Sequence, residues 1–236
     1  MNSSELKGYL TGLIIGDGHI DKGITKRAFE IKNTHFDFIQ KIKNDIESCS
    51  TFKINIKYRS EHTSKDSIHH KESWVLRIDA HPYFNKKYHH FYDDYRGRTV
   101  SNEAVSWLTS NGLANWYMSD GYVCLVGKEK NNIYNRRVEF CTDRYPKPIV
   151  EKLSKMLYDK FNIESSVIKR GKYYRIRVKT VSYQTFINLI YPYVVPSMQY
   201  KLYLGYECQP KWMEDWTWDL QNSLKSAMAL TSNVAG

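Results

Sequence analysis

The sequence lacks the features that mark several large protein classes. Its four cysteines are scattered and form no CxxC pair, which argues against a zinc ribbon or a disulfide framework and favours a reducing compartment. No run approaches the roughly 18 apolar residues of a membrane-spanning helix, and the opening MNSSELKGYL resembles neither a signal peptide nor a presequence. Walker loops, dinucleotide fingerprints and nucleophile elbows are also missing. We therefore expect an intracellular protein without a membrane partner.

Negative charge is also scarce. The 236 residues contain 35 lysines and arginines against 25 aspartates and glutamates, a net charge of +10. Residues 207–236 carry two lysines and four acids, which leaves +12 on residues 1–206. Nineteen tyrosines accompany this charge, and cations combined with aromatic rings suit the phosphates, sugars and bases of a nucleic acid. Solubility alone would also account for a basic surface, so charge leaves both interpretations open.

The chain contains a diverged internal repeat in which residues 6–100 align with residues 109–206. Each half opens with a short apolar helix that ends in an acidic turn, LTGLIIGDG (Leu10–Gly18) or LANWYMSDG (Leu113–Gly121). A short strand, an amphipathic helix, two alternating strands and an aromatic-rich helix follow in each half. This order predicts an α+β fold of two pseudo-symmetric αββαββα halves, each with an antiparallel sheet.

The repeat also gives the expected domain boundaries. We predict an N-terminal half at residues 1–98 and a C-terminal half at 99–206, which includes a linker at 99–108. An acidic, tryptophan-rich tail follows at 207–236. Since no Gly/Ser-rich or Pro-rich linker separates the halves, we expect them to share a close interface.

Basic side chains occupy one face of several predicted strands. Residues 52–59 and 73–80 alternate apolar with polar positions, and residues 167–180 form a predicted hairpin that turns near Arg170 and Gly171. A solvated sheet face would explain any single strand, but basic faces on corresponding strands of both halves fit the major groove of DNA. The candidate DNA-contacting residues are Lys53, Asn55, Lys57, Arg59 and Arg77 for one half-site, and Arg175, Arg177 and Lys179 for the other. Because the two sets differ, we expect a non-palindromic target.

An aspartate ends each of the two apolar helices. Gly8, Gly12 and Gly16 form a smooth stripe on the first helix, which allows another backbone to approach closely. An anion at the C-terminal end of a helix is electrostatically unfavourable, and Asp-Gly alone would be an ordinary turn. Asp17 and Asp120, however, lie at equivalent repeat positions, so helix-to-helix packing would bring two repelling carboxylates together unless a proton or a metal intervenes. Hard oxygen ligands favour Mg²⁺, and carboxylate-held Mg²⁺ suggests phosphodiester hydrolysis through metal-bound water.

The two nine-residue segments resemble the two copies of the signature that names the LAGLIDADG homing endonucleases. The chain is similar to the monomeric, double-motif branch of that family over residues 6–206. The resemblance implies two saddle-shaped sheets that straddle double-stranded DNA, with the motif helices packed between them. It also implies a Mg²⁺-dependent (or Mn²⁺-dependent) endodeoxyribonuclease that makes double-strand breaks across the minor groove, at a long target, in intron or intein homing.

The resemblance also suggests roles for particular residues. The metal-binding acid of the signature falls on Asp17 and on Asp120, and the carbonyls of Gly16 and Ser119 would help to hold the metal. Lys201 resembles the family's polar partner of the metal site. Arg98 takes the equivalent repeat position, because 103 residues separate it from Lys201, as they separate Asp17 from Asp120.

Some features of the second motif depart from the family pattern. Asn115 replaces the small packing residue and bulky Trp116 and Tyr117 follow it, which predicts a looser approach of the helices or a side-chain hydrogen bond between them.

Two alternatives to a nuclease stay open: an intron maturase of the same family that binds the host intron RNA, and a DNA-binding regulator without catalysis. Retention of both acids argues against the regulator.

Overall fold

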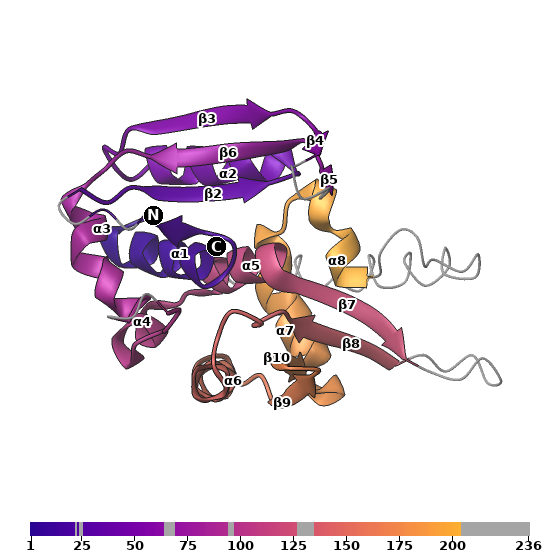
Figure 1. Ribbon diagram of the computed structural model, residues 1–236. Coiled ribbons are helices and arrows are strands. Elements are labelled where there is room, and N and C mark those ends of the chain that lie inside the picture. Colours follow the sequence, from indigo (N-terminus) through magenta and orange to yellow (C-terminus); the bar gives the residue numbers. More distant parts are fainter. Residues whose placement is uncertain (22, 24–25, 64–68, 94–96, 127–134, 204–236) are drawn as a thin grey trace, which may run out of the picture.

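The computed structural model of the chain describes residues 1–21, 23, 26–63, 69–93, 97–126 and 135–203. The predicted tail at 207–236 therefore lies outside the described residues. Within them, two halves of similar design lie on either side of a pair of central helices, α1 (Ser3–Ile15) and α5 (Ser110–Asp120) (Figure 1). No helix in this part of the chain has the length and apolar character to cross a membrane.

The first half is built on a four-stranded antiparallel sheet with the strand order β1-β2-β6-β3. Its strands are β1 (His19–Ile20), β2 (Phe29–Asn33), β3 (Ile54–Arg59) and β6 (Ser73–Ile78), and a separate small ladder pairs β4 (His62–Thr63) with β5 (His69–His70). The helical segments that follow α1 are α2 (Phe36–Glu47), α3 (Pro82–Lys87) and the 3₁₀ turn η1 (Tyr88–His90).

The second half repeats this design after a short connecting helix, α4 (Asn102–Trp107). Its sheet has the strand order β7-β8-β10-β9, formed by β7 (Gly121–Val126), β8 (Asn135–Phe140), β9 (Ser165–Arg170) and β10 (Tyr173–Val178). The helical segments after α5 are α6 (Lys147–Phe161), η3 (Thr180–Ser182), α7 (Tyr183–Ile190), η4 (Tyr191–Tyr193), η5 (Pro196–Met198) and α8 (Tyr200–Tyr203). The matching strand orders confirm the predicted fold of two pseudo-symmetric halves.

The amphipathic helix of each half covers one face of its sheet. Helix α2 contacts β2, β3 and β6, and α6 contacts β9 and β10. Sequence periodicity predicted both helices. Their apolar stripes are buried, including Ile39 and Ile42 on α2 and Leu153 and Leu157 on α6. The opposite face of each sheet is left for the polar residues of the alternating strands.

Local sequence explains where the first central helix begins. The Asn2 side chain accepts hydrogen bonds from the backbone N–H groups of Ser4 and Glu5 at 2.9 and 3.0 Å. The Glu5 carboxylate accepts the Asn2 N–H at 2.8 Å, which completes a capping box. The start of α1 is thus fixed, and its other end points to the centre of the molecule.

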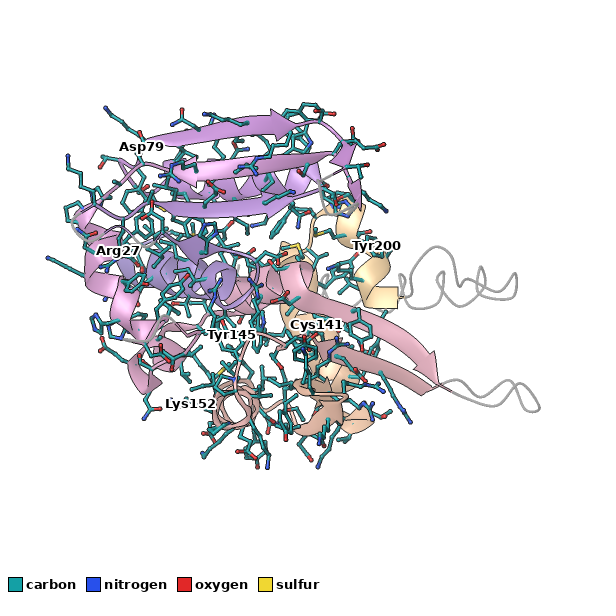
Figure 2. All side chains as sticks on the ribbon, in the orientation of Figure 1. Arg27, Asp79, Cys141, Tyr145, Lys152 and Tyr200 are labelled. Carbon is teal, nitrogen blue, oxygen red and sulfur yellow. The ribbon has the colours of Figure 1, made fainter. Side chains whose placement is uncertain are left out.

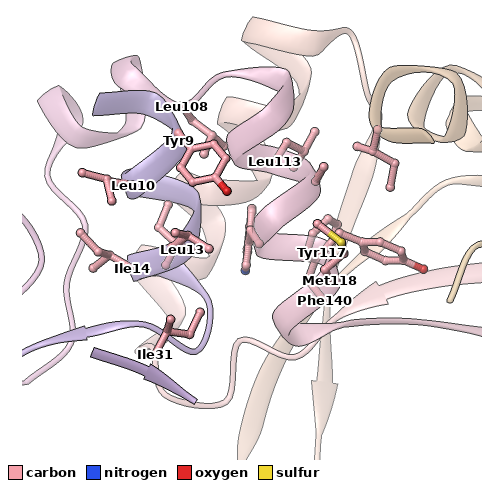
Figure 3. Close-up of a cluster of buried hydrophobic side chains, with 14 of the residues drawn as sticks. Tyr9, Leu10, Leu13, Ile14, Ile31, Leu108, Leu113, Tyr117, Met118 and Phe140 are labelled. Atoms are coloured by element: carbon pink, nitrogen blue, oxygen red, sulfur yellow. The ribbon is translucent and has the colours of Figure 1, made fainter. Parts of the chain in front are cut away.

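Glycines let α1 and α5 pack backbone against backbone. A Cβ atom added at Gly12 would lie 1.8 Å from the carbonyl oxygen of Gly112, and one added at Gly112 would lie 2.2 Å from that of Gly8. The predicted glycine stripe on α1 therefore meets a glycine on α5. Apolar side chains such as Leu13 and Leu113 surround this contact (Figure 3).

The expectation of a looser helix contact at Asn115 is wrong, because Gly112, one turn earlier, supplies the close approach. The Asn115 side chain is fully buried and lies beside the Tyr9 phenol of α1. The alternation of residues 73–80 also predicts that Ser73 faces solvent, and this prediction is wrong, since Ser73 is 1% exposed. Ser73 lines a cleft whose wall also includes Met198 and Tyr200 from the second half.

Candidate active site and nucleic-acid interface

The C-terminal ends of α1 and α5 meet at the pseudo-symmetry axis. Gly16 ends α1, and a Cβ added to it would lie 2.7 Å from the Cβ of Ser119 on α5. Asp17 follows Gly16 directly and Asp120 is the last residue of α5. The structure therefore brings together the four residues that the motifs predict for the metal site.

A single arginine lies between the two carboxylates. Nη2 of Arg144 is 3.3 Å from Oδ1 of Asp17 and 3.6 Å from Oδ2 of Asp120. The same nitrogen donates a hydrogen bond to the Gly16 carbonyl oxygen at 3.0 Å. One guanidinium thus lies between the two acids and offsets the repulsion between them.

The loop that carries Arg144 begins just after β8 and reaches α1 from the second half. The neighbouring Tyr145, labelled in Figure 2, donates a hydrogen bond to the carbonyl oxygen of Ile15 at 3.0 Å. Burial raises the pKa of this phenol to about 12, so it stays a donor. Aligning FEIKN with VEFCT places Arg144 opposite His35 in the repeat, so the arginine is found in one half only.

The two acids differ in their surroundings. The Asp120 side chain is 14% exposed, against 35% for Asp17. Burial, reinforced by the negative charge of Asp17, raises the pKa of Asp120 from 3.8 to about 7, although Arg144 and Lys201 act in the opposite direction. In the absence of a divalent ion, Asp120 is therefore partly protonated at neutral pH.

This raised pKa predicts a specific dependence of stability on pH. Asp120 binds its proton more tightly in the folded state than in the unfolded chain, so protonation of Asp120 stabilises the fold. This contribution to the free energy of unfolding is fully present below pH 4 and is lost as the pH rises to about 7. Urea unfolding in EDTA, followed by tryptophan fluorescence, should show this fall in the free energy of unfolding. Asp120→Asn should remove this component, whereas the exposed Asp159→Asn should keep it. An unchanged pH profile in Asp120→Asn would contradict the assignment.

Lys201 and Arg98 lie at equivalent ends of the two motif helices. Nζ of Lys201 donates to the carbonyl oxygens of Met118 at 2.5 Å and Ser119 at 3.4 Å. Arg98 donates through Nη1 to Ile14 and through Nη2 to Gly18, both at 2.9 Å. Each cation therefore sits where a helix dipole is negative, and the predicted equivalence of the pair agrees with this placement.

The charge of Lys201 also interacts with those of Asp17 and Asp120. Burial lowers the pKa of its ammonium group, while Asp17 and Asp120 pull in the opposite direction. The lysine, Asp17 and Ser119 line a cleft of about 430 Å³, which lies beside the helix ends. The other lining residues are Lys32, Asn33, Thr34, His35, Ser73, Met198 and Tyr200.

The donor set at the helix ends fits a hard divalent cation. It consists of two carboxylates and the nearby carbonyls of Gly16 and Ser119, which are all oxygen donors. Arg144 already shows that a cation is accommodated between them. No group of three or more His, Cys, Asp or Glu side chains with metal-binding geometry exists among the described residues. A bound Mg²⁺ would therefore take further ligands from water and from a substrate phosphate.

Six of the predicted DNA-contacting residues lie on β3, β6 or β10, whereas Lys53 precedes β3 and Lys179 follows β10. Lys53, Asn55, Lys57, Arg59, Arg77 and Lys179 are exposed, whereas Arg175 and Arg177 are half-buried. Most of them pair with an acid. Arg175 binds Asp143 through two hydrogen bonds of 2.8 and 2.6 Å, and Lys179 binds Glu164 at 2.9 Å. Sequence alternation identified these cations but not their acidic partners.

Two features of this architecture define its class: paired helices that end in acids, and a basic-faced antiparallel sheet on either side. Residues 7–186 match the model of the LAGLIDADG DNA endonuclease family. The chain belongs to this family, as its two nine-residue motifs predicted.

Relatives of the chain include both endonucleases and maturases by name. It is 26% identical to a probable intron-encoded endonuclease of Wickerhamomyces canadensis, over 82% of this chain and 81% of that protein. It is also 26% identical to cytochrome b mRNA maturase bI2 of Saccharomyces cerevisiae, over 81% of this chain but only 45% of the maturase. Among solved structures, the homing endonuclease I-WcaI bound to its DNA recognition sequence has the same fold, with a TM-score of 0.70 at 23% identity, covering 86% of this chain and 88% of that one.

Proposed function

We propose that the protein is a site-specific, divalent-metal-dependent DNA endonuclease that makes double-strand breaks at a long, non-palindromic target. The observation that carries this proposal is the convergence of Asp17 and Asp120 on one cation-binding point between two basic-faced sheets. A protein that only binds DNA gains nothing from carboxylates placed where phosphates must approach. The family and the DNA-bound structural relative support the same conclusion.

In this proposal Asp17 and Asp120 hold Mg²⁺ or Mn²⁺ with help from the Gly16 and Ser119 carbonyls. The ion supplies a Lewis acid for the scissile phosphate and lowers the pKa of bound water. Arg144 lies between the two carboxylates, where its charge would also offset that of a substrate phosphate. Asp120 must be ionised to bind the ion, so metal binding should strengthen as the pH rises through about 7.

Lys201 and Arg98 complete the proposed site. Both cations lie within a few ångströms of the helix ends, where negative charge develops on the phosphate during hydrolysis. Lys201, whose pKa is lowered by burial, also suits proton transfer. A guanidinium stays charged at all relevant pH values, so Arg98 can contribute charge stabilisation only.

The removal of Lys201 is predicted to slow cleavage more than it weakens DNA binding. Lys201→Ala should reduce the single-turnover rate by roughly 10²-fold, which is typical of losing one positioned donor. Lys155→Ala on the outer face of α6 is the control and should leave the rate unchanged. A loss of affinity at an unchanged single-turnover rate would show instead that Lys201 anchors the DNA backbone.

A maturase is the second candidate function, because the yeast relative is named as an mRNA maturase. Both functions can be tested with the full chain. Incubation with a randomised DNA library and Mg²⁺ should give cuts at a single long site, whereas a maturase would promote splicing of the intron that contains its reading frame. If the reading frame lies in an intron, the exons that flank it are known. The rejoined sequence of these exons is the expected DNA target.

A further inference from the structure

The two sheets share an arrangement that the repeat does not reveal by itself: one glutamate beneath two arginines. On the second sheet, Glu139 of β8 lies opposite Arg177 of β10, and Arg170 lies at the end of β9. On the first sheet, Glu30 of β2 lies opposite Arg77 of β6, and Arg59 lies at the end of β3. Both glutamates belong to the same strand of the repeat.

In the second sheet the glutamate is tightly held. Arg177 donates to Oε1 of Glu139 through Nε at 2.9 Å and through Nη2 at 2.8 Å. Arg170 donates to the same oxygen at 3.0 Å, and the Tyr122 hydroxyl donates to Oε2. The Glu139 side chain is 0% exposed, whereas those of Arg177 and Arg170 are 26% and 47% exposed. The carboxylate therefore lies under the guanidinium groups, on the polar face of the sheet.

In the first sheet the same arrangement is looser. Arg77 Nη1 is 3.4 Å from Oε2 of Glu30, and Arg59 Nη2 is 3.9 Å from Oε1. The Glu30 side chain is 23% exposed, and the two arginines are 44% and 54% exposed. Arg77 also contacts Asp21 at 3.2 Å. The N-terminal arginines are thus less constrained than their C-terminal counterparts.

This difference matters for base recognition. A guanidinium that is held along its Nε–Nη2 edge still presents the outer N–H groups of Nη1 and Nη2, and these two donors form the fork that pairs with guanine. A long side chain that is already ordered loses less conformational entropy when DNA binds. Discrimination between bases should therefore be sharper where the arginine is fixed beforehand.

We propose that Glu139 is a positioning residue that fixes Arg177 and Arg170 for base recognition, and that Glu30 does the same more weakly for Arg77 and Arg59. The half-site bound by the C-terminal sheet is then discriminated more strictly than the half-site bound by the N-terminal sheet. This inference rests on the proposed DNA-binding function. Glu139 itself contacts no base, and its effect passes through the arginines.

The test is a binding selection from a randomised target library in Ca²⁺, so that base preference is measured without cleavage. Glu139→Gln should relax preference by about tenfold at the base pairs that Arg177→Ala also relaxes, within the 1–3 kcal/mol typical of one bidentate contact. Glu30→Gln should relax the opposite half-site by a smaller factor. Glu151→Gln, an exposed acid that pairs with Lys147 on α6, is the control and should change neither half-site.

Two further variants separate positioning from a purely structural role. At the base pairs that Arg177→Ala relaxes, the double variant Glu139→Gln/Arg177→Ala should show no further relaxation, because both changes act there through the Arg177 side chain. Tyr122→Phe removes one hydrogen bond to Glu139 without changing its charge, and should relax the same half-site if Glu139→Gln does not fold. Thermal denaturation of each variant shows whether the fold is retained.

The outcomes distinguish this inference from the proposed function. If the wild-type protein selects no sequence, the proposed function fails. If it selects a site, but folded Glu139→Gln and Tyr122→Phe keep the same preferences or lose affinity equally for all sequences, the positioning role is overturned. Stricter discrimination in the N-terminal half-site would overturn the predicted asymmetry.

Discussion

Replacement of either Asp17 or Asp120 with asparagine is expected to abolish double-strand cleavage while target binding survives. Each change removes one ligand charge from a cation site that has only two carboxylates. Metal assistance is worth several kcal/mol in the transition state, which corresponds to a rate loss of about 10³-fold. Contacts between the sheets and DNA are not altered, so affinity measured in Ca²⁺ should stay within a few-fold of that of the wild type.

A supercoiled plasmid that carries the target site measures this loss directly, since linear and nicked products separate on a gel. Asp159→Asn, which removes an acid from the exposed surface of α6, is the matched control and should cleave at the wild-type rate. Full cleavage by either active-site variant would contradict a site that needs both carboxylates. Loss of target binding in both variants would instead assign the aspartates a structural role.

The sequence was sufficient for those parts of the molecule that repeat or alternate. The two αββαββα halves follow from the repeated order of elements, the basic strand faces from alternation, and the pairing of Asp17 with Asp120 from the 103-residue offset of the two motifs. Lys201 was found through the family resemblance and Arg98 through its equivalent repeat position, and the structure places both at the ends of the motif helices. Periodicity succeeds here because it reflects which side of a helix or strand faces the core.

Arg144 could not be found from the sequence, because its position depends on a loop that reaches across the molecule. It is separated from Asp17 by 127 residues and has a histidine, His35, at its repeat equivalent. The only signal in the sequence was a basic residue in the loop between β8 and α6. Sequence periodicity also gave no indication that Glu139 lies beneath two arginines, since alternation predicts the face of a residue but not its charge partner.

Ser73 shows the complementary limit. Its position on β6 predicts exposure, but Ser73 is buried at the wall of a cleft that Met198 and Tyr200 also line. Contacts between segments far apart in the sequence decide burial at strand ends. The helix contact is likewise decided by the partner segment: α1 approaches α5 at Gly112 and not at the motif position Asn115.

The second large effect is expected from Gly12→Ala at the helix contact. The added Cβ would lie 1.8 Å from the Gly112 carbonyl oxygen, a backbone atom that cannot rotate away. Alanine favours a helix over glycine by about 1 kcal/mol, but overpacking typically costs about 1–3 kcal/mol and sometimes more. Since the clash is with backbone, we expect a net destabilisation at or above the upper end of that range.

Cleavage should fall together with stability in Gly12→Ala, because Asp17 and Asp120 are carried by the two helices that must separate. A displacement of about 1 Å at reacting groups can cost roughly 10²-fold in rate. Gly171→Ala is the control: it strains a turn at φ +58° but meets no atom within 4 Å, so it should cost about 1–2 kcal/mol and leave the helix contact intact. Urea unfolding measures both variants, and wild-type stability in Gly12→Ala would show that α1 and α5 do not pack at their glycines.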